Sequence, residues 1–217
     1  MNTIKNTLVA AALVAFGAAR ADAGVIFSEG FDDVGGLVGA GWEVRNFSSA
    51  GGSTEWFQGN TGVFTAQDGA EDSYVAANFL AAPAGGNVNL YLLAPELLLQ
   101  DGDTISFWTR TDADGADFGD SLFLGFWDVG PLFGINIGNA VGGYPTEWTR
   151  YSQLIGGLGG PTAVQFGFLY TGPADVLNYI GIDSVEVTRP DPVPEPGSLM
   201  LLGLGLAGLG LVRRRRG

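Results

Sequence analysis

The sequence predicts an all-β protein: a two-sheet antiparallel β-sandwich or jelly roll, flanked by an N-terminal signal helix and a short C-terminal hydrophobic helix. Two observations predict the sandwich. Short apolar segments recur between clusters of Gly, Asn, Asp and Pro, and 36 of the 217 residues are glycine. No stretch of the central region keeps the 3.6-residue period of an amphipathic helix. We therefore expect the core of the central region to consist of strands joined by turns.

Several of these segments alternate between residues of two faces, as strands with one buried face do. Ile105 and Phe107 fall on one face of their segment, and Trp108 falls on the other. No internal repeat divides the chain, so we expect all strands to belong to one domain. The predicted strands are Val25–Phe31, Trp42–Phe47, Glu55–Phe57, Tyr74–Asn78, Val88–Leu93, Thr104–Arg110, Ser121–Trp127, Thr149–Leu154, Ala163–Tyr170 and Gly181–Thr188.

Residues 1–23 have the pattern of a secretory signal peptide. Lys5 supplies the positive n-region, Leu8–Ala19 is the apolar h-region, and Ala21-Asp22-Ala23 offers the small residues of a cleavage site. A signal peptidase would then release a chain that begins at Gly24. Cleavage at Ala19-Arg20-Ala21 and retention as an uncleaved N-terminal anchor are the alternatives.

The rest of the chain divides into three parts. Residues 24–189 are the predicted sandwich, residues 190–198 are a stiff proline-rich linker, and residues 199–217 are an apolar run followed by arginines. The uncharged run Leu199–Val212 is shorter than the about 20 residues that a stable membrane span needs. The arginines behind it would keep the C-terminus in the cytoplasm. Such a helix suits a segment that is recognised and then cut away.

This tail closely resembles the PEP-CTERM sorting signal of Gram-negative bacteria. The resemblance is carried by Pro194, Glu195 and Pro196, by the apolar run, and by the cluster Arg213, Arg214, Arg215 and Arg216. It implies export through the inner membrane, transient contact with that membrane, and processing by an exosortase, a membrane-embedded transpeptidase-like enzyme. The expected destination is the cell surface or the extracellular matrix. A simple tail anchor behind a proline-rich linker and a buried apolar helix are the alternatives.

The body resembles a second family, choice-of-anchor J, which is similar to cleaved-adhesin and MAM-type jelly rolls. The residues that carry the resemblance, in order, are Phe27–Asp32, Gly41–Trp42, Ser73–Asn78, Leu93–Glu96, Gly102–Arg110 and Tyr179–Val187. The sequence departs from the family pattern in the acidic loop Asp112–Asp120. The resemblance implies a jelly-roll fold and no known catalysis.

The body is strongly acidic. Between Gly24 and Pro196, 22 acidic residues face four arginines and no lysine, a net charge of −18. Such a surface repels phosphates and excludes a nucleic-acid partner. The chain also has no cysteine and no histidine. This excludes disulfides, the usual zinc ligand sets, and Ser-His-Asp or Cys-His catalysis.

Three acidic residues form a candidate calcium site. Asp183 shares strand parity with Val185 and Val187, which should face the core, and a buried carboxylate needs donors or a cation. Glu29 and Asp32 end the first strand, which commonly lies beside the last strand in a jelly roll. We therefore predict that these three oxygen donors gather around one Ca²⁺, and the likeness to calcium-bearing jelly rolls favours it. The alternative is that Asp183 accepts backbone N–H bonds while the other two are solvated.

Other acidic residues give no specific site. Asp112–Asp117 with Asp120 begins like an EF-hand loop, but Ala116 and Phe123 stand where oxygen ligands should be. A solvated hairpin loop fits this segment better. A secreted hydrolase would need a carboxylate pair, and the sequence singles out no pair.

Trp108 is the best candidate for a ligand-binding tryptophan, because Ile105 and Phe107 take the opposite face of its strand. A tryptophan on a sheet face can stack on a sugar ring, although more often it packs against the core. From these observations we expect an exported surface or matrix protein without enzymatic activity, with a role in adhesion or exopolysaccharide interaction. A carbohydrate-binding module and a secreted hydrolase are the alternatives.

Overall fold

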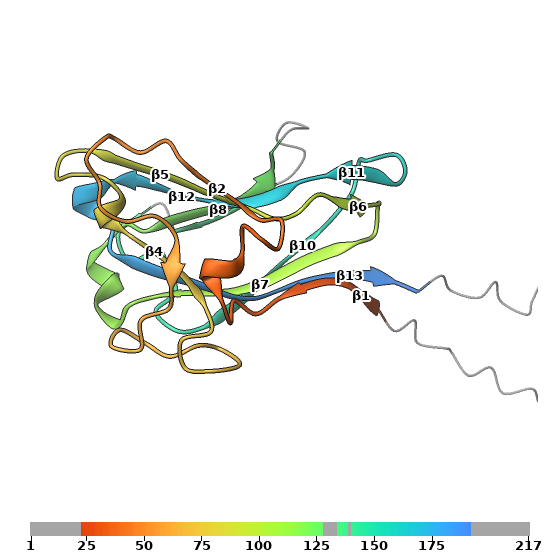
Figure 1. The fold of residues 1–217 in the computed structure, drawn as a ribbon, viewed down its shortest axis with the longest axis horizontal. Coiled ribbons are helices and arrows are strands. Elements are labelled where there is room, and N and C mark those ends of the chain that lie inside the picture. Colours follow the sequence, from red (N-terminus) through yellow and green to blue (C-terminus); the bar gives the residue numbers. More distant parts are fainter. Residues whose placement is uncertain (1–22, 128–133, 139, 192–217) are drawn as a thin grey trace, which may run out of the picture. The chain divides into compact units, whose positions relative to one another are not determined.

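The computed structural model describes residues 23–127, 134–138 and 140–191. Ala23–Pro190 form one compact unit built from strands and short 3-10 helices (Figure 1). Among the described residues, no helix has the length and apolar character needed to cross a membrane. The predicted signal helix, the Pro-Glu-Pro motif, the apolar run and the arginine cluster lie outside the described residues.

The first sheet, the lower layer in Figure 1, has the strand order β10-β7-β13-β4-β3, and β1 pairs with the second half of β13. β13 is central to this sheet, because its 12 residues pair with β1, β4 and β7. The strands are β1 (Ala23–Glu29), β3 (Phe57–Gln58), β4 (Val75–Asn78), β7 (Thr104–Thr111), β10 (Thr149–Leu154) and β13 (Tyr179–Pro190).

The second sheet, the upper layer in Figure 1, has the order β2-β5-β12-β8-β9 and is antiparallel throughout. Its strands are β2 (Glu43–Asn46), β5 (Asn87–Leu93), β8 (Ser121–Phe126), β9 (Gly134–Gly138) and β12 (Phe166–Pro173). A separate ladder joins β6 (Leu97–Leu99) to β11 (Thr162–Val164). The 3-10 helices are η1 (Val34–Gly36), η2 (Phe79–Ala81), η3 (Ala113–Asp117) and η4 (Ala174–Val176).

The core lies between the two sheets. Leu90 and Leu92 of β5 and Phe168 of β12 face Ile105 and Phe107 of β7, and all five are fully buried. The rings of Phe107 and Phe168 meet edge to face with centroids 4.9 Å apart, which links the layers directly. Burying a side chain of this size contributes about 1.5–3 kcal/mol. The predicted all-β sandwich is therefore confirmed.

The structure differs from the prediction in some strands. The predicted strand Ala163–Tyr170 is two strands, β11 and β12, interrupted at Gln165, whose backbone carbonyl accepts a hydrogen bond from the Trp127 N–H. β6 and β9 were not predicted. The first is a run of leucines, and the second alternates only over Ile135, Asn136 and Ile137 between two glycines. Neither therefore gives the alternation over about four to eight residues that reveals a half-buried strand.

Asp183 does not face the core, so the prediction from its parity with Val185 and Val187 is wrong. The pairing of β13 with β7 shifts register between Asp183 and Glu186, and Ser184 adopts a left-handed φ of 50°. This β-bulge reverses the alternation of the strand. Asp183 therefore lies on the outer side of the sheet. The loop between β3 and β4 covers it, and Asp183 is fully buried.

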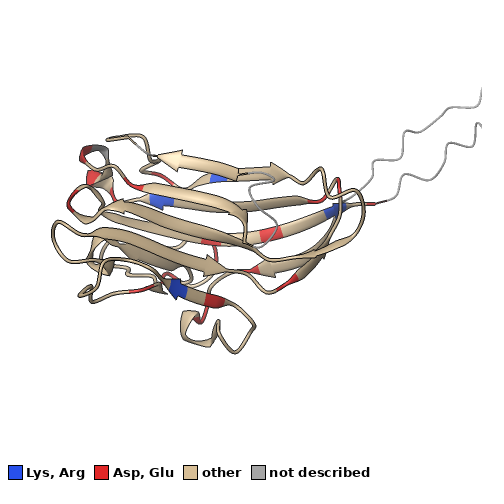
Figure 2. Cartoon of the chain, turned by 90° about the horizontal axis from the view of Figure 1, so that it is seen from above, with Lys and Arg blue, Asp and Glu red and all other residues tan. Residues whose placement is uncertain are grey.

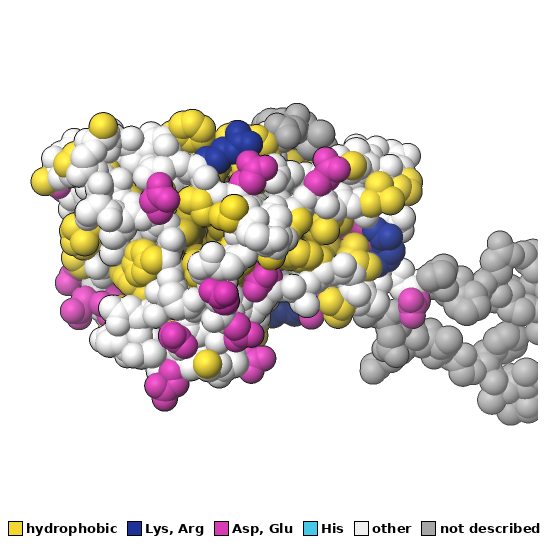
Figure 3. Space-filling view, in the orientation of Figure 1, with side chains coloured by type: hydrophobic (Ala, Val, Ile, Leu, Met, Phe, Trp, Pro, Cys, Tyr) yellow, Lys and Arg dark blue, Asp and Glu magenta, His cyan; other side chains and the backbone are white. Residues whose placement is uncertain are grey.

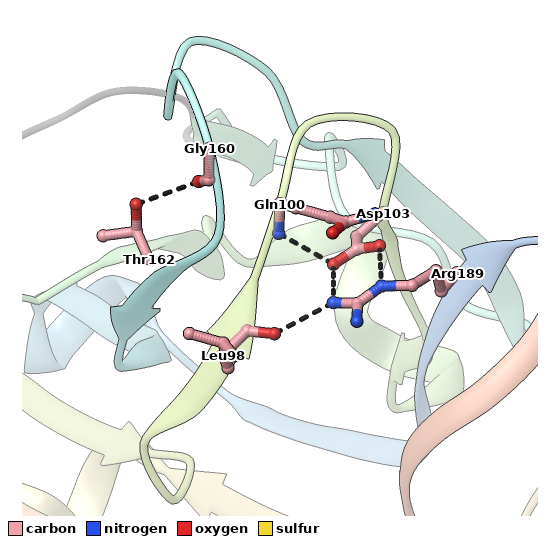
Figure 4. A network of polar contacts seen from close by, with 6 residues as sticks. All are labelled: Leu98, Gln100, Asp103, Gly160, Thr162 and Arg189. Atoms are coloured by element: carbon pink, nitrogen blue, oxygen red, sulfur yellow. Dashed lines mark hydrogen bonds and ion pairs between the residues drawn. The ribbon is translucent and has the colours of Figure 1, made fainter. Parts of the chain in front are cut away.

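An ion pair holds the end of β13, where the chain leaves the sandwich (Figure 4). The guanidinium of Arg189 donates to both carboxylate oxygens of Asp103, at 2.8 Å from Nε and 2.7 Å from an Nη. Gln100 donates its backbone N–H to the same carboxylate, and Arg189 also donates to the carbonyl of Leu98. Because the Asp103 side chain is fully buried, this bidentate pair ties β13 firmly to the turn before β7.

Candidate functional site

The outer face of the five-stranded sheet carries an aromatic row. In strand order, register places Arg45 of β2 beside Tyr91 of β5, then Leu169 of β12, Phe123 of β8 and Asn136 of β9. Neighbours in register point to the same side of a sheet. Leu90, Leu92, Leu122, Leu124, Phe168 and Tyr170 fill the core, so this row must point outward. Apolar side chains thus hold the middle of the face, with polar ones at both edges.

The next row of the same face contains three glycines. It runs from Glu43 of β2 and Leu93 of β5 to Gly167, Gly125 and Gly134 on β12, β8 and β9. Three adjacent strands thus present glycine at the same level beside the aromatic row. The side chain of Leu93 occupies the space over Gly167, since a Cβ atom on Gly167 would lie 2.5 Å from Leu93 Cδ2.

Trp127 follows β8, and its ring reaches across the glycine row to residues of the aromatic row. Its ring meets Tyr91 edge to face with centroids 5.0 Å apart, and the Arg45 guanidinium lies 4.7 Å from the tryptophan ring. Arg45 is also paired to Glu43 at 2.7 Å. The hydrogen bond from Arg45 lowers the pKa of Glu43. The two charges at this edge therefore neutralise each other, and the guanidinium covers one face of the Trp127 ring.

Together these residues line a groove of about 370 Å³, bounded by Tyr91, Leu93, Phe123, Leu124, Gly125, Phe126, Trp127, Gly134, Gly167, Phe168 and Leu169. Among the described residues that line it, none is acidic or basic. The described part of the lining therefore offers stacking surfaces and backbone. Figure 2 shows the chain from above this sheet. The strands in front are mostly uncharged, and several acidic residues lie in the loops at one end.

Trp108, the tryptophan singled out from the sequence, lies elsewhere. It is half-buried on the outer side of the other sheet, in register with Arg150 and Asp183. Sequence reasoning missed Tyr91, Phe123 and Trp127. For Phe123 and Trp127 the sequence does hold a signal. Along β8 and the residue after it, Phe123, Gly125 and Trp127 alternate with the core residues Leu122, Leu124 and Phe126. That signal gains meaning only when the register of distant strands is known.

The three predicted calcium ligands each have protein partners. Asp183 accepts the backbone N–H groups of Gln67 and Asp68, Asp32 accepts the hydroxyl of Ser73, and Glu29 accepts the N–H two residues ahead. Burial raises the pKa of Asp183, and these backbone donors oppose the rise. Among the described residues, no three acidic side chains are grouped to hold a metal ion. The geometry gives this trio no support, and calcium binding stays a prediction.

Asp120 is another fully buried acid. It accepts hydrogen bonds from Tyr170 and the N–H of Asn178, and it shares a hydrogen bond with the hydroxyl of Thr111. Burial raises its pKa, again against these donors. Neither Asp120 nor Asp183 lines the groove, so both carboxylates belong to the internal structure.

The comparisons with known proteins separate the tail from the body. Residues 192–216 match the family described as the PEP-CTERM protein-sorting motif, which confirms the resemblance of the tail. The motif begins directly after the described part of the chain and indicates export. No curated protein is significantly similar to the chain.

The body is similar to solved cleaved-adhesin domains of Lys-gingipain from Porphyromonas gingivalis W83. The K3 domain superposes with a TM-score of 0.53 at 20% identity, covering 77% of this chain and 99% of that domain. The K1 domain gives a TM-score of 0.51 at 18% identity, covering 75% and 97%. At these identities the likeness shows the fold alone, the cleaved-adhesin type of sandwich.

Proposed function

We propose that this protein is exported, processed by an exosortase-type enzyme, and displayed at the cell surface or in the extracellular matrix, where it binds a glycan such as exopolysaccharide. The single observation that carries the binding role is the aromatic groove on the five-stranded sheet. The sorting motif at residues 192–216 supports the delivery, together with the signal peptide predicted at residues 1–23. Signal peptidase, the exosortase and the inner membrane are transient partners in this scheme.

Stacking on the groove favours a sugar ligand. Tyr91, Phe123 and Trp127 line the groove on the outer face of the five-stranded sheet, and Phe123 is exposed. Aromatic side chains bind the apolar C–H faces of sugar rings, while their polar edges stay in contact with water. A ligand site of this kind is a concave, mostly apolar surface that forms without large rearrangement.

A binding role fits better than a hydrolase role. A hydrolase would need a carboxylate pair at a cleft, one of them with a raised pKa. The acids with raised pKa values, Asp120 and Asp183, are buried and hydrogen-bonded away from the groove. Adhesion through protein contacts alone remains the second candidate, and the test below separates the two.

The test is glycan binding by the exported protein, measured on a glycan array and by affinity electrophoresis with exopolysaccharide. We expect Trp127→Ala to abolish binding, because it removes the indole ring that contacts Tyr91 and Arg45. Trp108→Ala is the matched control, since it removes a tryptophan from the opposite sheet, and it should bind like the wild type. Binding that depends on Trp108 and not on Trp127 would contradict the assignment. Absence of glycan binding in the wild type would leave protein-mediated adhesion.

A further inference from the structure

We infer that a second site, a pocket at the end of the sandwich opposite Ala23 and Pro190, binds a partner protein through an apolar side chain that is flanked by lysine or arginine. The pocket shares no lining residue with the aromatic groove, so this inference is independent of the proposed glycan binding. Three observations lead to it: the place of the pocket in the fold, its apolar lining, and the charge around it.

The pocket lies where β13 begins. It is lined by residues of η2, which directly follows β4, and of η4, which shortly precedes β13. Ala23 and Pro190 pair at the other end of β13. β13 has 12 residues, and a strand rises about 3.3 Å per residue, so the two ends of β13 lie about 36 Å apart. In Figure 1, η2 and η4 are at the left, and the paired ends of β1 and β13 are at the right. A domain attached through either of these paired ends therefore presents the pocket outward.

The pocket is apolar and open. Its volume is about 390 Å³, at the lower end of the range of about 300–1,000 Å³ that ligand sites occupy. Ala82, Ala174 and Leu177 are buried and form the floor, whereas Phe79 and Leu80 stand at the rim with exposed fractions of 41% and 43%. Exposed apolar side chains that gather around a hollow mark an interaction surface.

Hydrogen bonds between backbone groups hold the walls in place. Phe79 donates its N–H to the carbonyl of Asn178 at 3.0 Å, which ties η2 to the segment before β13. Ser53 donates its N–H to the carbonyl of Leu80 at 2.8 Å, which adds a third segment. A side chain can therefore enter a pocket that is already formed, and little binding energy is lost in ordering it.

The rim is acidic. Asp175 lines the pocket, and both of its carboxylate oxygens accept the N–H of Gly85, at 3.0 and 3.1 Å. This contact fixes the carboxylate and leaves lone pairs for a cation. Asp114 and Asp117 lie on η3, which ends directly before the lining residue Phe118. No basic residue lines the pocket within the described part of the chain.

The charge decides which occupant fits. On the face shown in Figure 3, acidic side chains clearly outnumber basic ones, and hydrophobic side chains are exposed at the left end. A second copy of this chain would bring the same acidic end against the pocket, and an anionic membrane surface would be repelled in the same way. A protein segment with a cationic residue next to an apolar one matches both the rim and the floor.

The experiment titrates the isotope-labelled exported protein with three tripeptides, blocked at both ends, and follows the backbone amide signals by NMR. The peptides are Lys-Phe-Lys, Glu-Phe-Glu with the charge reversed, and Lys-Ala-Lys without the ring. We expect Lys-Phe-Lys to shift signals of residues 79–85 and 174–178 and to bind at least about fivefold tighter than the other two.

Two pairs of variants test the assignment. Asp175→Asn should weaken binding of Lys-Phe-Lys about threefold, whereas Asp101→Asn, which changes another exposed aspartate that accepts a backbone N–H, should not change it. Leu80→Ala should weaken binding about threefold, whereas Leu154→Ala, which changes an exposed leucine of β10, should bind like the wild type. Leu80→Ala should also leave glycan binding unchanged.

The contrary results are specific. If Glu-Phe-Glu binds as tightly as Lys-Phe-Lys, if no peptide shifts the signals of residues 79–85 and 174–178, or if both variants of the pocket bind like the wild type, the inference is overturned. It is also overturned if sedimentation shows that the wild type forms dimers that Leu80→Ala dissociates, because the occupant is then a second copy. None of these results affects the proposed glycan binding, which depends on Trp127.

Discussion

At the scale of single residues, Asp120 shows how a buried acid is accommodated. The hydroxyl of Thr111 has one proton but lies within hydrogen-bond distance of two acceptors, Asp120 Oδ2 at 2.7 Å and the carbonyl of Tyr179 at 2.8 Å. Both contacts are satisfied when Asp120 is protonated and donates to Thr111, while Thr111 donates to the carbonyl. The raised pKa of Asp120, caused first by burial, agrees with this arrangement.

Asp120→Asn is therefore expected to be as stable as the wild type or more stable at pH 7, since the amide can donate to Thr111 and accept from Tyr170. Because the pKa of Asp120 is raised in the folded state, its contribution favours folding below the ordinary value of 3.8 and is lost as the pH rises through the folded-state pKa. The melting temperature of the wild type relative to Asp120→Asn should thus fall as the pH rises above 3.8 and through the raised pKa of Asp120. A difference that does not vary with pH would refute the protonated arrangement.

Calcium is a second question at this scale. If Glu29, Asp32 and Asp183 bind calcium, millimolar Ca²⁺ should raise the melting temperature. At 100 times its Kd the ion would add about 2.7 kcal/mol to the free energy of unfolding. Asp183→Asn should abolish that rise. If EDTA and Ca²⁺ leave the melting temperature unchanged, the hydrogen bonds from Gln67 and Asp68 are the whole account of Asp183.

At the scale of elements, β13 holds the first sheet together, and the Asp103–Arg189 pair secures its end (Figure 4). Burial tends to raise the pKa of Asp103, but the hydrogen bonds from Arg189 and Gln100 outweigh it, so the pKa is lowered. The stability that Asp103 contributes is therefore present above the ordinary value of 3.8 and is lost as the pH falls through the lowered pKa.

Arg189→Leu should destabilise the domain by about 3 kcal/mol at pH 7, because it leaves a buried carboxylate without its partner. Urea unfolding of the two proteins measures this difference. The loss should shrink as the pH falls below 3.8 and through the lowered pKa of Asp103, because the carboxyl then becomes protonated. Arg150→Leu, which removes a more exposed arginine that donates to Ser106, is the matched control and should cost less than 1 kcal/mol. Equal losses in both variants would rule out a special role for the pair.

Much of this element scale could be predicted from sequence. Alternation predicted segments such as Thr104–Arg110 and Thr149–Leu154, which are strands β7 and β10. The reversal at Asp183 could not be predicted, because a bulge depends on the φ angle of Ser184 and on the register against β7. The groove could not be predicted for a related reason. Its two rows are assembled from five strands, and the pairing of strands is set by packing over the whole sheet.

At the scale of the whole molecule, the two ends of the sandwich lie together. Ala23 pairs with Pro190 in register, at the start of β1 and the end of β13. The predicted cleavage point before Gly24 and the sorting motif from residue 192 onward are thus joined to the same edge of the domain. A body cut at these predicted points would lose only Ala23 from β1 and would keep the rest of β1 and all of β13.

Intact-mass measurement of the protein recovered from washed cells tests this account most directly, with cells that lack the exosortase as the comparison. We predict a chain that begins at Gly24 and contains no residue beyond Pro196, and a longer, unprocessed chain when the enzyme is missing. Recovery of the apolar segment Leu199–Val212 on the protein from normal cells would contradict the account and would indicate a simple tail anchor.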